Sequence, residues 1–318
     1  MLLLDHAGDN IIGMDISIVI NQMIVLFILL VVGVVCARTG LVDTETNRRI
    51  TRFAVAVPQS AMILSSVMTM EEHMTAGRVA GLLAAGFGMY GLLFLLALAI
   101  PRIARINRRD RGLYSFMIMF ANTAFMGIPV VRAMYGGIGV FYVALFCVPF
   151  NVLAYTVGIQ FICGQGQGGF QWREAVSPTM IAALTAAVLV FLPIQYPAPL
   201  TEAMGYLGNM ITPLSMIIIG ASLGKQKFRD VFGDWRAYAF APVRLILTPV
   251  VVWAVMGLFV HDETVLGVIT VIEAMPVASL TTMLSIRYDA NEETASRTVF
   301  VTTALSVLTI PFVCWLLL

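Results

Sequence analysis

The feature that most constrains this chain is a series of apolar runs, each about 20 residues long and bounded by charged clusters. An α-helix rises about 1.5 Å per residue, so roughly 20 residues cross the hydrocarbon core of a bilayer. The runs are too continuously apolar for the alternating strands of a membrane barrel. The sequence therefore predicts an all-α polytopic membrane protein. We place ten transmembrane helices, at residues 16–37, 49–69, 77–100, 112–134, 138–162, 175–194, 201–223, 237–260, 264–286 and 293–317.

The composition supports this fold class and excludes several others. Of the 318 residues, 59% are hydrophobic and 12% are charged, whereas about 25% of residues in soluble domains are charged. A net charge of +1 gives no reason to expect a nucleic-acid partner. The four cysteines have no paired spacing, so we expect neither a disulfide framework nor a metal site, and no motif predicts a cofactor. These cysteines are Cys36, Cys147, Cys163 and Cys314.

An intramembrane hydrolase is the enzyme class that such a chain could belong to. His6, His73 and His261 are its three histidines, and all fall in or near predicted outer loops, so no zinc motif can form on a helix. The predicted spans also contain no pair of aspartates for an aspartyl protease. We therefore expect a protein that is not an enzyme.

Basic residues predict the orientation. Most of the 19 Lys and Arg residues fall in the loops after helices 1, 3, 5, 7 and 9, with the densest cluster between Arg102 and Arg111. Cytoplasmic loops carry the excess of Lys and Arg, so this side is predicted to be cytoplasmic. Both termini are then predicted to lie on the outer side of the cell membrane, with the basic loops near anionic lipids.

The chain divides into two halves with an odd number of helices each. Residues 1–162 hold helices 1 to 5 and residues 175–318 hold helices 6 to 10, with a Gly/Gln-rich linker at 163–174. Two halves that share a fold must then have opposite topology. Proline landmarks agree, since Pro58 matches Pro213 and Pro129 matches Pro276. Because prolines are common in membrane helices, coincidence remains an alternative.

Pro129 and Pro276 lie near the middle of helices 4 and 9. A proline removes one backbone donor and clashes with the carbonyl four residues earlier, so we expect both helices to be broken at these positions. Breaks at the bilayer midplane are tolerated where protein or a hydrated cavity meets the freed backbone groups. Two breaks in corresponding positions predict a transport site.

Four stretches of the chain carry a resemblance to a known family. They are Phe120–Val130, Thr212–Gly224, Glu273–Pro276 and Ser285–Asn291. Together they resemble the auxin efflux carrier (PIN-like) family, whose bacterial members include malonate and malate carriers. The resemblance implies ten helices in two inverted five-helix repeats, with crossed broken helices 4 and 9. It also implies a dimeric scaffold of helices 1, 2, 6 and 7, and a domain of helices 3–5 and 8–10 that moves like an elevator.

The same resemblance implies a substrate site at the crossing of helices 4 and 9. It puts Asn122, followed by Thr123, at the family's anion-binding asparagine, and Pro129 and Pro276 at the two crossover prolines. Ser279 follows the second proline and can line the cavity or bond a carbonyl of its own helix. The other residues predicted around the substrate are Val57, Pro58, Gly127 and Thr179.

Two departures from the family pattern bear on the substrate. Ser177-Pro178-Thr179 stands where Asn-Pro-Asn or Asn-Pro-Thr often opens helix 6, and Glu273 replaces a glutamine of plant members. The resemblance therefore implies a small organic anion, such as the dicarboxylates malonate or malate, rather than auxin. Asn122 offers amide donors that suit a carboxylate, although an ordinary interhelical hydrogen bond is the alternative.

Glu273 and Arg244 are an acidic and a basic residue placed deep within spans. Intramembrane charges are costly and usually functional. Two interpretations stay open. The residues form a permanent pair that ties helices 8 and 9 together, or they act in transport, where either Glu273 exchanges a proton during the cycle or Arg244 counters the charge of the substrate.

Two other functions remain possible from the sequence. A sodium/proton-type cation antiporter on the same architecture would want carboxylates at the crossing, where this chain has one glutamate and one asparagine. A non-transporting membrane sensor is the other alternative. The sequence leaves the coupling ion open between proton and sodium, and the homodimer is expected from the resemblance alone.

Overall fold

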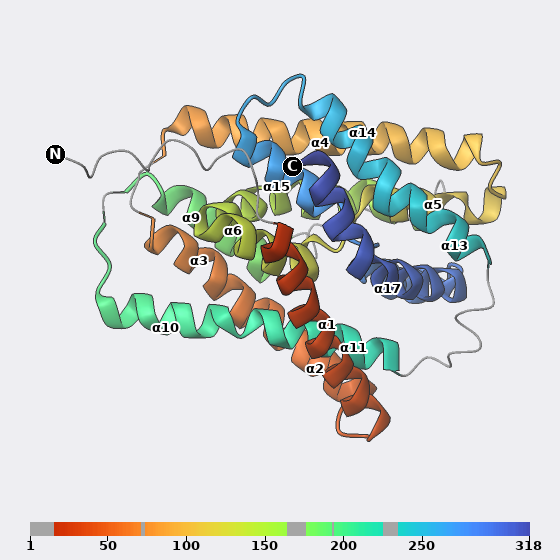
Figure 1. Ribbon diagram of the computed structural model, residues 1–318, viewed down its shortest axis with the longest axis horizontal. Helices are drawn as coiled ribbons and strands as arrows, with labels where there is room; N and C mark the ends of the chain where they lie inside the picture. Colours follow the sequence, from red (N-terminus) through yellow and green to blue (C-terminus); the bar gives the residue numbers. More distant parts are fainter. Residues whose placement is uncertain (1–15, 71–73, 164–175, 193, 225–234) are drawn as a thin grey trace.

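A computed structural model describes residues 16–70, 74–163, 176–192, 194–224 and 235–318 of the chain (Figure 1). These residues form an all-helical protein. Within the described ranges there is no β-strand, and strand-like pairing is limited to an isolated bridge between Ala121 and Val277. The predicted linker at 163–174 lies outside the described residues except for Cys163, and so do residues 1–15.

In the first half, long helices alternate with short π-helical turns. The elements are α1 (Ile16–Arg38), α2 (Thr44–Ala54), η1 (Val55–Gln59), α3 (Ser60–Met68), α4 (Ala76–Ile103), α5 (Arg108–Met119), η2 (Thr123–Gly127), α6 (Ile128–Leu153), η3 (Ala154–Gly158) and α7 (Ile159–Cys163). The segments α2, η1 and α3 follow one another without interruption, and so do the segments from η2 to α7.

The second half is also helical and contains one π-helical turn, η4. Its elements are α9 (Pro178–Leu189), α10 (Ala198–Asn209), α11 (Ile211–Gly224), α13 (Trp235–Pro242), η4 (Val243–Leu247), α14 (Thr248–Met256), α15 (Glu263–Glu273), α16 (Leu280–Arg287) and α17 (Glu292–Leu317). The segment η4 joins α13 to α14 without a break, whereas a non-helical stretch separates α15 from α16.

Capping residues fix where several helices begin. Asp43 accepts a hydrogen bond from the Thr46 N–H at 2.7 Å, and Asp262 accepts one from the Val265 N–H at 3.1 Å. A side-chain oxygen at this position satisfies an N–H that has no partner inside the helix. The same kind of bond starts α4, α5, α9 and α17, at Thr75, Asn107, Ser177 and Asn291.

Seven helices of the described residues are long and apolar enough to cross a membrane. One of them, Thr123–Cys163, has 41 residues, which correspond to about 60 Å, or twice the hydrocarbon thickness. Gly136 bends this helix with φ 63° and ψ −150°, a conformation that only glycine adopts readily. Segments α5, α9, α15 and α16 are shorter than a full span. The described residues thus show seven such helices, where the sequence predicted ten.

The break in the first half does not lie at Pro129. Helix α5 ends at Met119, Phe120 is extended (φ −119°, ψ 109°), and Pro129 sits in the first turn of α6. The helix runs without interruption from η2 into α6, so the proline, which has no N–H to donate, follows directly on the wider π-helical turn and does not end the helix. Pro276, by contrast, lies within the stretch between Glu273 and Leu280. The first break therefore precedes its proline, while the second contains it.

For description we take the helices in two groups, which are in extensive contact through α6. In the first group α1 lies along α11, and α3 packs against α9 and α10 (Figure 1). The α1–α11 contact is backbone to backbone, because a Cβ on Gly220 would lie 2.0 Å from the Leu30 carbonyl oxygen. Asn47 ties α2 to α11, since its Nδ2 donates to the Ser222 hydroxyl at 2.9 Å. This group contains the predicted helices 1, 2, 6 and 7.

The second group contains α4, α5, α6, α13, α14, α15, α16 and α17. Arg78 joins three of its helices at one end. Its Nη2 donates to the Tyr142 hydroxyl of α6 and to the Asp262 carboxylate before α15, both at 3.0 Å. The two groups meet where α6 packs against α3 and α9 and where α1 packs against α6 and α17.

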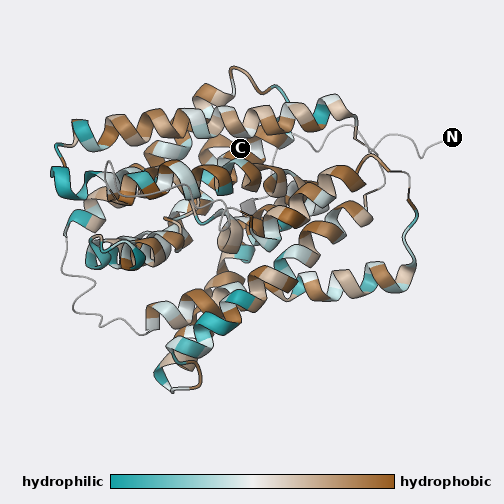
Figure 2. Cartoon of the chain, turned by 180° about the vertical axis from the view of Figure 1, so that it is seen from behind, coloured by the Kyte–Doolittle hydropathy of each residue, from teal (hydrophilic) through white to brown (hydrophobic). Residues whose placement is uncertain are grey.

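The distribution of apolar and hydrophilic residues over the helices is that of a protein in a membrane. Figure 2 shows apolar residues along the helices and hydrophilic residues gathered at the left edge of the view, where α4 ends and α5 begins. Helix α1 exposes an apolar face that includes Ile24, Phe27 and Ile28. Such a continuous exposed apolar face suits contact with lipid. The protein is thus an all-helical membrane protein with several apolar membrane-crossing helices.

Candidate functional site

Two breaks in helical structure lie side by side in the interior. The first is Phe120–Asn122, after α5, and the second is Ala274–Ser279, after α15. The Asn122 N–H donates to the Pro276 carbonyl at 2.8 Å, and the Ala278 N–H donates to the Phe120 carbonyl at 3.1 Å. Backbone groups that a break frees must be satisfied inside the protein when the segment lies in a membrane. Each break supplies hydrogen bonds to the other. We call these two stretches the paired breaks.

Neighbouring elements complete the backbone bonds of the paired breaks. The Asn122 carbonyl accepts from the N–H groups of Met126 and Gly127, at 3.2 and 3.1 Å, and so starts the π-helical turn η2. The Val277 N–H donates to the Thr302 hydroxyl of α17 at 3.3 Å. The main chain of each break is therefore held by the other break, by η2 or by α17.

The side chains beside the first break are not satisfied in the same way. Asn122 and Thr123 are both buried. The amide nitrogen of Asn122 has no hydrogen-bond partner among the described residues, and the hydroxyl of Thr123 faces the hydroxyl of Tyr90. Buried polar groups usually have a partner, and a group without one needs an explanation. At the start of η2 and α6 these two groups form a place where a polar or anionic ligand could bind.

A buried ion pair lies next to the second break. Arg244 of η4 and Glu273, the last residue of α15, are both 0% exposed, and Arg244 Nη1 lies 3.2 Å from Glu273 Oε2. Arg244 Nε and Nη2 and Glu273 Oε1 are buried without a hydrogen-bond partner among the described residues. The structure thus brings together the two intramembrane charges that the sequence singles out, through a single contact.

Tyr90 connects the ion pair with the first break, and sequence reasoning missed it. Its ring is stacked on Phe120, with 6.2 Å between ring centroids, and it is 1% exposed. Tyr90 also lies within electrostatic range of Glu273 and Arg244. In sequence it is one tyrosine in an apolar, glycine-rich helix, and no spacing relates it to residues 30 or more positions away. Only packing reveals its position.

The remaining predicted residues lie in two places. Gly127 packs against the end of α15 and the second break, since a Cβ on it would lie 3.6 Å from Ile272 Cγ2 and 3.5 Å from Met275 Cγ. Ser279 ends the second break and makes no capping hydrogen bond with its side chain. Pro58 and Thr179 belong to the first helix group, where η1 packs against α9. Thr179 is buried and its hydroxyl has no partner in the described part of the chain, while Val57 is exposed.

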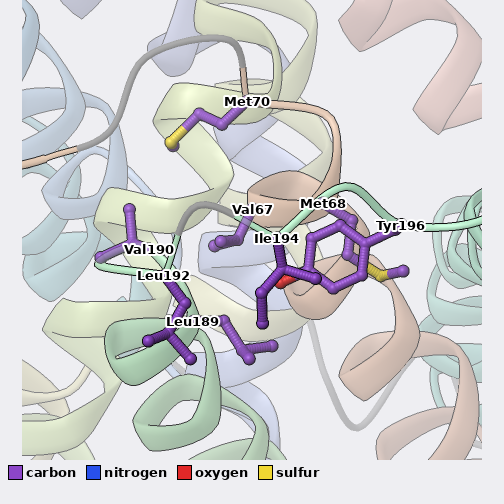
Figure 3. A pocket seen from close by; sticks show the side chains of 8 residues that line it. All are labelled: Val67, Met68, Met70, Leu189, Val190, Leu192, Ile194 and Tyr196. Atoms are coloured by element: carbon purple, nitrogen blue, oxygen red, sulfur yellow. The ribbon is translucent and has the colours of Figure 1, made fainter.

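A small pocket lies elsewhere, at the ends of α3 and α9 (Figure 3). Its side chains are nearly all apolar, with one hydroxyl from Tyr196. Such a lining does not suit an anion, and the pocket contains none of the predicted site residues. It is lined by Val67, Met68, Met70, Leu189, Val190, Leu192, Ile194 and Tyr196.

Comparison with known proteins identifies the family. Residues 18–314 match the family described as membrane transport protein. The chain belongs to this family. The match covers nearly the whole chain and confirms the resemblance to auxin efflux carriers.

Three related proteins align with about two thirds to nearly all of this chain. An uncharacterized transporter of Methanocaldococcus jannaschii is 24% identical over 311 residues, which cover 94% of this chain and 98% of the relative. A protein named "Putative malonate transporter" in Rhizobium meliloti is 23% identical over 274 residues, covering 83% of this chain and 84% of the relative. An uncharacterized transporter of Methanothermobacter thermautotrophicus is 27% identical over 222 residues, covering 66% and 71% of the two chains. The chain is accordingly a membrane transport protein and not an enzyme.

Proposed function

We propose that this membrane transport protein is a secondary transporter of a small organic anion, with its site at the paired breaks. The observation that carries the proposal is the set of buried polar groups without partners beside two breaks that satisfy each other's backbone. Asn122 and Thr123 supply donors, and the N–H groups at the start of a helix favour a negative charge. The relative named as a malonate transporter supports a carboxylate, and a dicarboxylate such as malonate or malate is the substrate class that we propose.

Ten transmembrane helices in two inverted repeats fit the described elements. The bend at Gly136 divides Thr123–Cys163 into the end of helix 4 and the whole of helix 5. Segments α15 and α16 form a broken helix 9, as α5 with the start of α6 forms a broken helix 4. The antiparallel pairing of the two breaks supports repeats of opposite topology, with residues 1–162 in one repeat and 175–318 in the other.

The sidedness that we propose rests on the basic loops. Asn291 Nδ2, at the start of α17, donates to Asp110 Oδ1 of α5 at 3.1 Å. This bond supports a common side for the loop before α5 and the loop before α17, both of which carry arginines. A common cytoplasmic side for these loops places both termini on the outer side of the cell membrane.

The two helix groups support an elevator-type mechanism. We propose that α1, α2–α3, α9 and α10–α11 form the scaffold, which dimerises, and that the other group carries the substrate. Backbone contact between α1 and α11 suits a rigid scaffold, and the Arg78 bonds suit a transport domain that moves as one body. Both paired breaks lie in the moving group, so the site travels with it.

The test is flux of radiolabelled acids into proteoliposomes that contain the purified full chain. We expect uptake of C3 or C4 dicarboxylates by the wild type and a loss of at least tenfold in Asn122→Ala, because the amide donors disappear. Asn209→Ala is the matched control, since Asn209 is exposed at the end of α10. We expect its uptake to equal that of the wild type.

Other outcomes would point to the other functions. No uptake of any mono- or dicarboxylate, with or without a pH or sodium gradient, would contradict an organic-anion transporter. Sodium-dependent proton release in the absence of an organic anion would favour a cation antiporter. Binding of an acid without flux would favour a sensor.

A further inference from the structure

The ion pair beside the second break is only partly satisfied. A guanidinium has five N–H donors in a planar fork, and a carboxylate accepts through two oxygens. Here one nitrogen of Arg244 and one oxygen of Glu273 meet at 3.2 Å. The Nε–Nη2 edge of Arg244 and Oε1 of Glu273 have no partner in the described ranges, although both residues are wholly buried. A pair that served only to tie helices together would be expected to satisfy these atoms, because unmet buried hydrogen bonds are costly.

The surroundings of Glu273 offer little else that is charged. Helix α15 packs against α6, α14, α17 and η2. Segments α14 and η2 contain no titratable side chain, and the acidic and basic residues of α17 are confined to its first two turns. Besides Arg244, the interior parts of these elements and of α4 carry the titratable side chains of Tyr90, Arg132, Tyr135, Cys147 and Cys314, and Arg132, on α6, is half-buried. Of the two arginines, Arg244 is the one that forms an ion pair with Glu273.

The unpartnered atoms of Arg244 and of Glu273 suit two different ligands. The Nε–Nη2 edge presents two parallel donors, the geometry that binds a carboxylate in a bidentate manner. An anion bound there would put two carboxylates against one guanidinium in a low-dielectric interior. Two carboxylates that share a site do not readily both ionise. A proton on Oε1 of Glu273 would neutralise that side chain and leave one carboxylate, that of the anion, opposite the one positive charge of Arg244.

We infer that the Arg244–Glu273 pair couples the transport of an anion to the transport of a proton. The Nε–Nη2 edge of Arg244 receives one carboxylate of the substrate, and Oε1 of Glu273 receives one proton from the same aqueous side. Both ligands leave on the opposite side, so an O–H bond forms and breaks once in each cycle and the anion is unchanged. The inference rests on the proposed function, and it names a dicarboxylate/proton symporter.

The location of the pair agrees with this role. Glu273 directly precedes the second break, and Tyr90 links the pair to Phe120 in the first. Arg244, Glu273 and Tyr90 all belong to the helix group that we propose to move. The pair would then remain intact when the group slides and would carry its ligands across. It would not act as a gate that opens between the groups.

The experiment uses radiolabelled malonate as probe and the full chain in proteoliposomes. In the wild type we expect the KM for malonate to rise with pH, approaching tenfold per pH unit above the protonation midpoint, as linkage of one proton requires. Uptake should move about one proton per malonate, measured with an entrapped pH-sensitive dye. In Glu273→Gln, which cannot titrate, we expect a KM that is independent of pH, exchange of malonate for malonate, and no linked proton movement. Glu263→Gln, at the exposed start of the same helix, is the matched control and should behave like the wild type.

Glu273→Gln leaves Arg244 buried without a counter-charge, so this variant could fail to fold. A second variant keeps the inference testable in that case. Arg244→Gln combined with Glu273→Gln removes both charges. We expect this double variant to remain monodisperse, to lose the pH dependence, and to bind malonate at least tenfold more weakly at low pH. A wild-type pH slope in Glu273→Gln, or wild-type affinity in the double variant, would overturn the inference. Wild-type uptake that is independent of pH would overturn it as well and leave the proposed function intact, whereas no uptake of any acid would contradict the proposed function.

Discussion

Asn122 serves the fold and the proposed site through different atoms. Its backbone N–H and carbonyl are both used, toward Pro276 and toward the first turn of η2. Its side-chain amide nitrogen has no partner among the described residues. Replacement of the side chain therefore leaves the main-chain bonds of the break in place. For this reason a loss of transport in Asn122→Ala would report on ligand binding rather than on the fold.

Tyr90 allows a test of the hydroxyl apart from the ring. In Tyr90→Phe the ring stays stacked on Phe120, so we expect the stability to change by less than about 1 kcal/mol. The hydroxyl lies in the electrostatic environment of Glu273 and Arg244, so we expect its removal to raise the KM for the anion severalfold. Thermal unfolding in detergent and uptake in proteoliposomes measure the two effects.

The matched control for this residue is Tyr206→Phe, because Tyr206 lies 74% exposed on α10. We expect it to change neither stability nor uptake. If Tyr90→Phe had the wild-type KM at every pH, the hydroxyl would have no part in the site, and Tyr90 would be a packing residue.

At the scale of elements, close approach of α1 and α11 depends on glycine. A Cβ on Gly220 would meet the Leu30 carbonyl oxygen at 2.0 Å, and one on Gly33 would meet the Ile217 carbonyl oxygen at 2.4 Å. Both neighbours are backbone atoms, so neither can turn away as a flexible side chain would. Small residues that let backbones approach are typical of helix contacts in membranes.

We predict that Gly220→Ala destabilises the protein by about 2 kcal/mol, the usual cost of forcing an extra carbon into a well-packed contact. Gly91→Ala in α4 is the control, because a Cβ there meets no atom within 4 Å. It should be neutral or slightly stabilising, since alanine favours helix over glycine. Thermal unfolding of the two purified variants measures the difference in stability. Equal stability of Gly220→Ala and Gly91→Ala would show that α1 and α11 can move apart.

The breaks show what element-level prediction could and could not reach. The sequence predicted breaks at Pro129 and Pro276, because a proline cannot continue a helical hydrogen-bond pattern, and of the two prolines only Pro276 lies in a break. The predicted position of the first interruption was wrong by several residues, since the helix continues through Pro129 from η2 into α6. The break forms at Phe120–Asn122 instead, where the second break supplies partners.

At the scale of the whole molecule, the proposed division into scaffold and moving domain has a direct test. A Cβ on Gly137 of α6 would lie 3.8 Å from Ser66 Cα in α3, across the two groups. A Cβ on Gly224 of α11 would lie 3.1 Å from Ala37 Cβ in α1, within the scaffold. Both pairs approach the separation that a disulfide needs. In a chain whose native cysteines are replaced, we predict that a Ser66→Cys/Gly137→Cys disulfide stops transport.

The control for that prediction is Ala37→Cys/Gly224→Cys, whose disulfide should leave transport at the wild-type rate. Reduction should restore transport in the first variant and change nothing in the second. Full transport by the oxidised Ser66/Gly137 pair would show that α3 and α6 do not move relative to each other, and would contradict an elevator.

The sequence by itself determined the class of protein, the approximate helices and the two intramembrane charges. Hydropathy, caps and prolines act over a few residues or one helix, so they can be read locally. The tertiary structure decided which groups meet: Ala121 with Val277, Arg244 with Glu273, and Tyr90 with Phe120. It also decided which polar atoms of the described residues remain without partners. Such pairings join residues that are far apart along the chain, and they depend on the packing of many helices that no local pattern encodes.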